Sequence, residues 1–285
     1  MLAGWPSAIF SDLGAKLLSS PRTTAHRTQK SSIAIIAIYT CATGAVCGVR
    51  SARAQTTLLS QDFESTSSFT DYYVANNSDN ARSGYAGFQF ASATTVTNYF
   101  AAQSGTSTSY VYSDYEAIAA GNTGTISTWL ITPTLTYQNG DVISFYTRTS
   151  GNTPVYPDRL VVRFSSAGSS TNVGSSASDF GDFTTPLLTI NPNLTTTDYP
   201  ATWTQYTATI SGLSAPTSGR VAFNYYVTNG GPTGSYSDFI GLDTLLFTRG
   251  AIAVPEPSGA GLICSGVLPL FGILSYRRTR NKARL

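Results

Sequence analysis

The feature that most constrains the fold of this chain is a strand-like pattern between residues 55 and 253. Short stretches rich in Val, Ile, Thr, Tyr and Phe alternate in polarity, and clusters of Gly, Asn, Ser and Pro separate them. Successive side chains of a strand point to opposite faces, so this alternation predicts strands with one buried and one solvated face. No convincing amphipathic helix interrupts the pattern. We predict strands at residues 57–63, 87–91, 125–131, 141–149, 159–165, 202–210, 220–227 and 241–248.

The number and spacing of these strands favour a single all-β domain over residues 55–250. Turn signals such as Asn139-Gly140 separate consecutive strands. We predict a two-sheet, jelly-roll-like β-sandwich. The Ser/Gly-rich stretch 166–178 is expected to be a flexible loop. The polar stretch 66–83 is expected to be irregular, with Tyr72 and Tyr73 attaching it to the core.

The N-terminal residues have the organisation of a secretory signal. Lys30 precedes an apolar stretch over 33–46, and Ala52 and Ala54 are small residues at the two positions that a signal peptidase reads. We therefore interpret residues 1–54 as an N-terminal extension and signal helix, with signal peptidase cleaving before Gln55.

The C-terminal residues 251–285 contain an apolar run at 259–276, which is long enough to cross a bilayer as a helix. The basic tail 277–285 behind it should stay in the cytoplasm, so the rest of the chain is expected to be exported. A short motif precedes the apolar run. The residues of the motif and the arginines of the tail are Val254, Pro255, Glu256, Pro257, Ser258, Arg277, Arg278 and Arg280.

This triplet of motif, short apolar helix and terminal arginines resembles the PEP-CTERM sorting signal of Gram-negative, polysaccharide-producing bacteria. The resemblance implies that an exosortase, a membrane protease, recognises and cuts the tail. It further implies a transient inner-membrane intermediate, followed by delivery to the cell surface or extracellular matrix. The alternative is an ordinary C-terminal membrane anchor.

The exported region has an unusual charge and side-chain inventory. Lys, His and Cys occur only outside residues 55–253, and six arginines face thirteen acidic residues there (15 overall, less Asp12 and Glu256), a formal charge of −7. This balance argues against nucleic acid as a partner, because phosphates require a basic surface. Without His or Cys, the region also lacks the residues for a Ser-His-Asp triad, a Cys-His pair or an ordinary zinc site.

Several short motifs occur in an order that resembles the choice-of-anchor J domain, a relative of cleaved-adhesin and MAM-like β-sandwiches. The resemblance covers residues 58–247 and implies a surface-anchored β-sandwich rather than a particular chemistry. The motifs are Asp62-Phe63-Glu64, Trp129-Leu130-Ile131-Thr132-Pro133, Asp141-Val142-Ile143-Ser144-Phe145, Asp158-Arg159-Leu160, Trp203-Thr204-Gln205-Tyr206 and Ile240-Gly241-Leu242-Asp243.

Calcium is the cofactor that the carboxylates of these motifs favour. Asp62 and Glu64 would lie on the same side of a strand, and Asp243 follows a glycine near the last strand. The first and last strands are neighbours in related jelly rolls, and calcium binds several oxygen ligands. We predict a structural calcium site from these three residues. The alternative is that Asp62 and Glu64 end a strand and Asp243 caps a turn. Asp158-Arg159 is interpreted as a local ion pair or turn.

The predicted function is that of a non-enzymatic, adhesive or structural module in an exopolysaccharide biofilm. Sugar rings stack on exposed aromatic faces, and several of the tyrosines are expected in loops, although most should be core or cross-strand residues. Trp129 and Trp203 are expected to be packing anchors. The tyrosines are Tyr72, Tyr73, Tyr85, Tyr110, Tyr112, Tyr115, Tyr156, Tyr225, Tyr226 and Tyr236. Two alternatives stay open. One is a carbohydrate-active enzyme that uses paired carboxylates, and the other is a passive surface protein without a specific ligand.

Overall fold

The computed structural model describes residues 55–250, so the predicted signal, sorting motif and membrane helix lie outside the described residues. Within them, no helix has the length and apolarity needed to span a bilayer. The elements in chain order are β1 (Thr57–Gln61), a 3-10 helix η1 (Thr66–Phe69), β2 (Tyr73–Asn76), β3 (Gln89–Phe90), α1 (Ala93–Asn98), β4 (Val111–Asp114), η2 (Tyr115–Ala117), β5 (Gly124–Ile131), β6 (Leu135–Tyr137), β7 (Val142–Thr149), β8 (Leu160–Ser165), β9 (Thr185–Ile190), β10 (Thr204–Thr209), β11 (Thr217–Gly230) and β12 (Phe239–Thr248).

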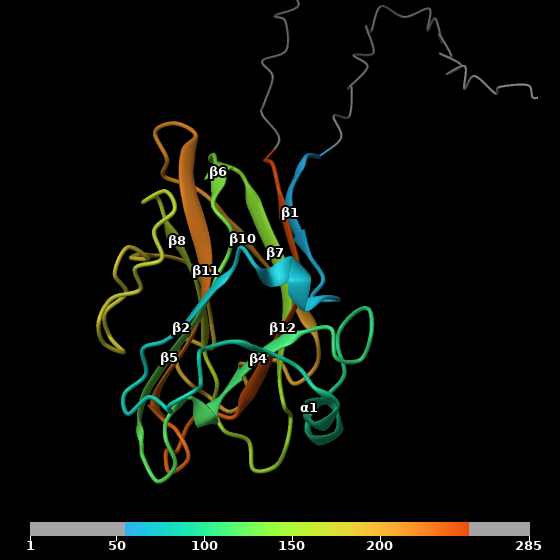
Figure 1. The fold of residues 1–285 in the computed structure, drawn as a ribbon, viewed down its shortest axis with the longest axis vertical. Helices are drawn as coiled ribbons and strands as arrows, with labels where there is room; N and C mark the ends of the chain where they lie inside the picture. The colour runs from blue at the N-terminus through green and yellow to red at the C-terminus, as the bar shows by residue number, and fades with distance from the viewer. Residues whose placement is uncertain (1–54, 251–285) are drawn as a thin grey trace, which may run out of the picture. The chain divides into compact units, whose positions relative to one another are not determined.

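The strands form two six-stranded antiparallel sheets (Figure 1). Sheet A has the order β10-β7-β12-β4-β3, with β1 also paired to β12. Sheet B has the order β2-β5-β11-β8-β9, with β6 also paired to β11. The predicted all-β sandwich is therefore confirmed. Most connections between consecutive strands from β4 onwards cross from one sheet to the other, as jelly rolls do.

The core lies between the inner faces of the two sheets. Phe145 of β7 and Phe223 of β11 are fully buried, and their rings meet edge to face with centroids 5.0 Å apart. Leu160 and Val162 of β8 are likewise buried beneath them. These inward positions are those that the alternation over 141–149 and 159–165 predicts. Burial of such side chains stabilises the fold by about 1.5–3 kcal/mol each.

Several elements differ from the sequence-based prediction. β1 ends at Gln61, because Phe63 takes a positive φ of 55° that a strand cannot continue. The stretch 66–83, expected to be irregular, contains β2, and the short helix α1 was not expected at all. A capping box between Ser92 and Thr95 satisfies the first turn of α1.

The long strands β11 and β12 each pair with two short strands along one edge. On β12, β4 pairs with Phe239–Leu242 and β1 pairs with Leu245–Thr248. Asp243 lies at the bulge between them. On β11, β5 pairs with Ala222–Gly230 and β6 pairs with Thr217–Gly219. Asp243 and the first pocket described below lie at these two junctions.

Loops cover the outer faces of both sheets. The connection from β8 to β9 brings Phe180 and Phe183 onto Trp129, which is fully buried on the outer face of sheet B. The Ser/Gly-rich stretch therefore begins a loop that is packed on the sheet. On sheet A, the partly buried Trp203 contacts Phe100 edge to face and donates from Nε1 to a backbone carbonyl. The prediction that both tryptophans are packing anchors is confirmed.

Candidate functional site

A surface pocket with a volume of about 520 Å³ lies at the junction between β5 and β6. Four segments that are distant in sequence build it: the start of β2, the β5–β6 connection, the β8–β9 loop and β11. The lining residues are Thr70, Asp71, Tyr72, Tyr73, Pro133, Thr134, Thr171 and Arg220.

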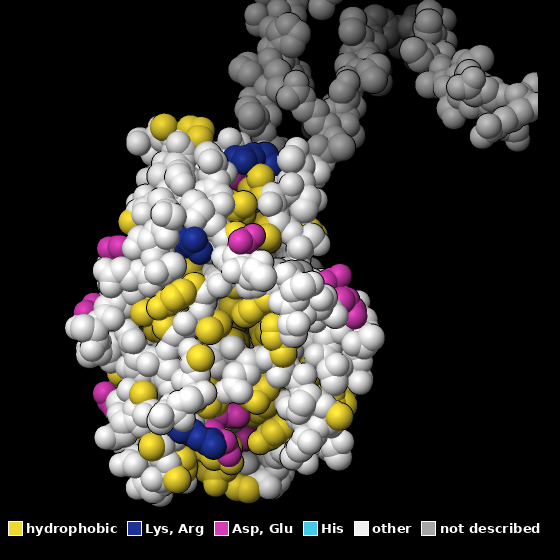
Figure 2. Space-filling view, viewed as in Figure 1, with side chains coloured by type: hydrophobic (Ala, Val, Ile, Leu, Met, Phe, Trp, Pro, Cys, Tyr) yellow, Lys and Arg dark blue, Asp and Glu magenta, His cyan; other side chains and the backbone are white. Residues whose placement is uncertain are grey.

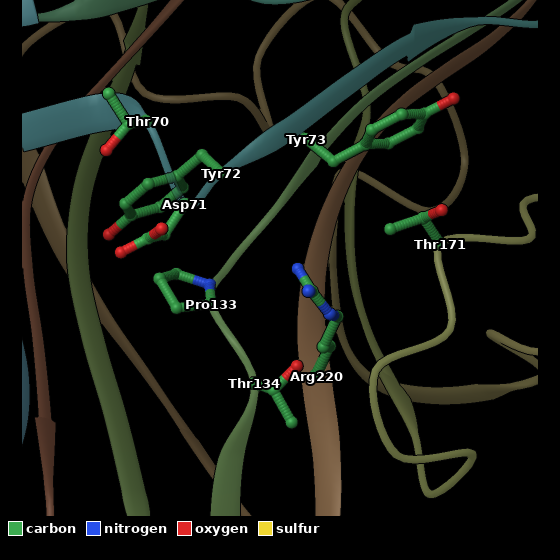
Figure 3. A pocket seen from close by; sticks show the side chains of 8 residues that line it. All are labelled: Thr70, Asp71, Tyr72, Tyr73, Pro133, Thr134, Thr171 and Arg220. Carbon is green, nitrogen blue, oxygen red and sulfur yellow. The ribbon is translucent and has the colours of Figure 1, made fainter.

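Tyr73 gives this pocket an exposed aromatic wall. Its side chain is 44% exposed, the largest exposed fraction among the large hydrophobic residues of the described region. Tyr72, which precedes β2 and also lines the pocket, stacks its ring on Phe69. Figure 3 shows the Tyr73 ring at one side of the pocket and Arg220 extending from β11 between Thr134 and Thr171.

Among the pocket residues, Arg220 and Thr134 each have a buried polar side-chain atom without a partner within the described residues. Arg220 donates from Nη1 to the carbonyl of Thr132 at 2.8 Å, but its Nε is buried and unpaired. The hydroxyl of Thr134 is also buried and unpaired. A buried polar group without a partner costs about 1–3 kcal/mol, so both atoms favour a ligand or water that can bond to them.

This set of groups suits a polar ligand with an apolar face. The Tyr73 ring offers an apolar surface for stacking. Beside it, the Nε–H of Arg220 can donate a hydrogen bond, and the hydroxyl of Thr134 can donate or accept one. The pocket contains a single carboxylate, that of the exposed Asp71. It therefore does not offer the two facing carboxylates that the alternative of a carbohydrate-active enzyme requires.

Two of the three residues predicted to bind calcium, Asp243 and Glu64, accept hydrogen bonds from a loop. Asp243 is fully buried. Its Oδ2 accepts hydrogen bonds from the N–H groups of Gln103 at 2.8 Å and Ser104 at 3.3 Å, and its Oδ1 accepts from the N–H of Thr244 at 2.6 Å. Burial raises the pKa of Asp243 to about 6, against the lowering effect of these donors.

Glu64 binds the same loop from the other side. Its carboxylate accepts from the N–H of Thr106 at 3.2 Å and from the hydroxyl of Ser109 at 2.8 Å. It lies directly over Gly105, where any side chain would collide with it, and Gly105 has a positive φ of 77°. The exposed Asp62 accepts from the N–H of Glu64 at 3.3 Å.

The positions and hydrogen bonds of these three acidic residues can be compared with what a calcium ion requires. β1 and β12 are neighbours, as predicted, but Asp62 and Glu64 follow β1 rather than lying within it. The described residues contain no group of three acidic, His or Cys side chains that could hold a metal ion. Moreover, N–H donors point at both loop-binding carboxylates, where a cation would need free oxygens. In this arrangement the residues do not fit a calcium ion, and the calcium site stays a prediction.

Removing the Asp243 carboxylate should release the 101–106 loop. We expect Asp243→Ala to lower the free energy of unfolding by about 2–3 kcal/mol, since it leaves the N–H groups of Gln103, Ser104 and Thr244 without their acceptor. Amide exchange of Gln103 and Ser104 should accelerate more than that of β5. Exchange that is uniformly unchanged in this loop would contradict the assignment.

A second group of carboxylates is buried at the other end of sheet A. Asp158 is fully buried and accepts from the hydroxyls of Tyr225 and Thr149, both at 2.5 Å, and from the N–H of Asp238 at 2.8 Å. Burial raises its pKa to about 6, and burial also raises the pKa of Asp114 to about 7. Within residues 55–250 Asp158 forms no ion pair with Arg159, so the ion-pair interpretation of the dipeptide was wrong, and the turn stays a prediction.

Comparison with known proteins leaves the family of this chain open. The chain matches no protein-family model and no curated protein. The resemblance to choice-of-anchor J therefore remains one of short motifs.

Solved structures that resemble this chain share little sequence with it. The K1 cleaved adhesin domain of Lys-gingipain from Porphyromonas gingivalis W83 is 21% identical with a TM-score of 0.44, covering 69% of this chain and 99% of that domain. The TmCBM61 structure in complex with β-1,4-galactotriose is 11% identical with a TM-score of 0.35, covering 64% and 90%. A cyclase from Fischerella sp. TAU is 13% identical with a TM-score of 0.40, covering 70% and 100%. Similarities at this level carry no argument about the function of this chain.

Sequence reasoning named Tyr73 only within a set of ten tyrosines and did not single out the pocket. Tyr73 was among the tyrosines expected to be able to stack on sugars, whereas Arg220 was not singled out. Its signal was an arginine inside a strand of an acidic, lysine-free domain, where a cation has few uses other than pairing or binding.

Proposed function

We propose that this chain is an exported surface or matrix protein whose β-sandwich binds a glycan of an exopolysaccharide matrix in the pocket beside Tyr73. The observation that carries the proposal is the exposed Tyr73 ring next to the unpaired Nε of Arg220 and hydroxyl of Thr134. Sugars present an apolar C–H face and hydroxyls around it, and these two kinds of group complement the pocket.

One face of the molecule, shown in Figure 2, carries few charged side chains, and basic and acidic side chains lie side by side near its lower end. Apolar side chains gather across its middle. An uncharged glycan would not require the dense basic surface that polyphosphates need. The proposal therefore keeps exopolysaccharide as the partner and excludes nucleic acid.

Export and sorting belong to the same proposal. Signal peptidase would cut before Gln55, and an exosortase-type protease would process the tail at 254–258 after transient insertion of 259–276 into the inner membrane. The module would then act at the cell surface or in the extracellular matrix. Mass spectrometry of the released protein should find a chain that starts at Gln55 and ends near the motif. A released chain that retains residues 277–285 would contradict the sorting proposal.

Binding of the purified full chain to the exopolysaccharide of the producing cell tests the pocket. We expect Tyr73→Ala to weaken binding about tenfold, since stacking on an aromatic ring contributes about 1–1.5 kcal/mol. Arg220→Gln should weaken binding to a similar extent. Tyr156→Ala is the matched control, because Tyr156 is a 40% exposed tyrosine outside the pocket.

Three outcomes of this titration would change the proposal. Equal loss in Tyr73→Ala and Tyr156→Ala would remove the pocket from it, and no binding by the unaltered chain would leave a passive surface protein. Shortening of the polymer during incubation would favour the enzyme. Binding that a calcium chelator abolishes, with the fold intact, would support the predicted calcium site of Asp62, Glu64 and Asp243.

A further inference from the structure

A second, smaller pocket lies on the outer face of sheet B, along strand β8. Its volume is about 230 Å³, and it shares no lining residue with the Tyr73 pocket. It contains two arginines and no carboxylate. Its lining residues are Arg159, Val161, Arg163, Pro186, Thr189, Pro192 and Tyr226.

The strand register explains why both arginines reach this pocket. Arg159, Val161 and Arg163 are alternate residues along the chain, so their side chains share one face of the sheet. That face is the outer one, because Leu160 and Val162 between them are buried in the core. The two arginines therefore stand at either end of Val161, about 13 Å apart along the strand at 3.3 Å per residue.

Aromatic rings hold both guanidinium groups in place. The Cζ atom of Arg163 lies 3.7 Å from the ring centre of Phe180, and that of Arg159 lies 4.7 Å from the ring centre of Tyr226. The Phe180 and Tyr226 rings in turn meet edge to face. Arginine stacked in this way loses little freedom when it binds an anion, because its planar donors are already oriented.

Hydrogen bonds within the protein use only part of each guanidinium. Arg163 is only 7% exposed, yet its one hydrogen bond within the described residues runs from Nε to Asn224 Oδ1 at 3.3 Å. Arg159 donates from Nε to the carbonyl of Tyr226 at 2.7 Å and from Nη1 to that of Pro192 at 3.4 Å. The Nη donors of Arg163 and the Nη2 of Arg159 have no partner in the described region.

Neither arginine has a counter-charge. The ion pairs within residues 55–250 join Arg82 to Glu116 and Arg249 to Asp141. The nearest acids in sequence to Phe180 are Asp179 and Asp182, whose carboxylates accept from Gly181 N–H and the Ser170 hydroxyl. Burial, followed by the charge of Arg159, lowers the pKa of Arg163 to about 10 against the raising effect of Tyr226. A buried cation without a partner is costly, so an anion in this pocket would relieve it.

We infer that the pocket formed by Arg159 and Arg163 binds carboxylate or sulfate groups of an acidic polysaccharide. Guanidinium groups bind both kinds of oxyanion through paired N–H donors, and two of them along one strand suit a chain that carries repeated anions. That the anionic groups belong to a polysaccharide rests on the proposed glycan-binding function. That the pocket binds an anion rests on the two arginines. The formal charge of −7 over residues 55–253, the two arginines included, makes a nucleic acid a poor alternative.

Binding of the purified full chain to three polymers tests this inference: alginate, which carries carboxylates, dextran sulfate, and uncharged dextran. We expect alginate, dextran sulfate or both to bind, and salt to weaken that binding. Arg159→Gln with Arg163→Gln should reduce the affinity at least tenfold. Arg82→Gln is the matched control, since it removes an equal type of charge outside the pocket, where Arg82 pairs with Glu116.

A second variant tests the pocket without removing either arginine, in case the double variant does not fold. Thr189→Glu leaves both arginines in place and introduces a carboxylate at the partly exposed lip of the pocket, so it should also abolish binding of the anionic polymers. Circular dichroism checks that each variant is folded. Wild-type affinity in folded Thr189→Glu, equal loss in Arg82→Gln, or dextran binding as tightly as the anionic polymers would overturn the inference.

The proposals for the two pockets can be refuted separately. Tyr73→Ala should weaken binding to the exopolysaccharide of the cell but leave the affinity for the anionic probe polymer unchanged. Loss of anionic-polymer binding in Tyr73→Ala alone would assign the anion to the Tyr73 pocket and overturn the inference. Absence of exopolysaccharide binding with intact anionic-polymer binding would refute the Tyr73 proposal only.

Discussion

Replacing Asp158 by alanine is expected to lower the free energy of unfolding by about 2–4 kcal/mol. The change leaves the hydroxyls of Tyr225 and Thr149 and the N–H of Asp238 without an acceptor. Tyr225 is fully buried, so no water readily replaces the lost carboxylate. Each stranded donor costs about 1–3 kcal/mol, partly offset because an ionised carboxylate no longer has to be buried. Urea unfolding at pH 7 measures the difference.

The controls separate this network from a general effect of removing an acid. Asp158→Asn keeps one carbonyl oxygen for Tyr225 and can donate its amide to Thr149, so it should lose less stability than alanine. Asp182→Ala removes an exposed carboxylate and should change the free energy of unfolding by less than about 0.5 kcal/mol. An Asp158→Ala protein as stable as Asp182→Ala would show that the network contributes nothing.

The domain is expected to be more stable at pH 5 than at pH 8. In the unfolded chain an aspartate binds a proton only below about pH 4. In the folded domain, burial raises the pKa of Asp158 to about 6 and that of Asp114 to about 7. The folded state therefore holds these protons more tightly. The stabilisation is complete below about pH 4 and is lost as the pH rises through 6 and 7.

Deprotonation of Asp158 and Asp114 between pH 5 and pH 8 should together lower the free energy of unfolding by about 3–4 kcal/mol. This corresponds to a fall in the melting temperature of roughly 10 °C. The raised pKa values of Asp238 and Asp243 act in the same direction. The lowered pKa of the exposed Asp179 changes stability only below about pH 4, outside this range. Thermal unfolding across this range measures the effect. Asp158→Asn, which cannot ionise, should flatten the profile. A melting temperature that rises from pH 5 to pH 8 would refute the assignment.

The sequence predicted the strands whose inner faces are strictly apolar. β7 and β8 alternate clearly, because Phe145 and Val162 face the core while their neighbours face outward. β9 was missed since Pro186 interrupts its pattern, yet a proline is tolerated there because β9 lies at the edge of sheet B. β2 was missed because a strand of four residues is too short for its alternation of polarity to be recognised.

The roles of the acidic residues could be predicted only in part. The resemblance to jelly rolls correctly suggested that the first and last strands would be neighbours, and hence that Glu64 and Asp243 would serve one region. It did not show that both carboxylates accept N–H groups of the 101–106 loop. Hydrogen-bond partners of this kind depend on where a long loop folds back, and no local periodicity encodes that position.

The sequence by itself determined that residues 55–250 form an all-β sandwich and lack the His and Cys of common catalytic sites, because both follow from local alternation and residue content. Only the tertiary structure decided which side chains meet. Tyr73 lies near Arg220 because β2 and β11 both pair with β5, and Arg159 and Arg163 are left without carboxylates because of the face on which β8 presents them. Strand pairing is a long-range choice made by burial of the whole core, so the two pockets form only once the sheets have assembled.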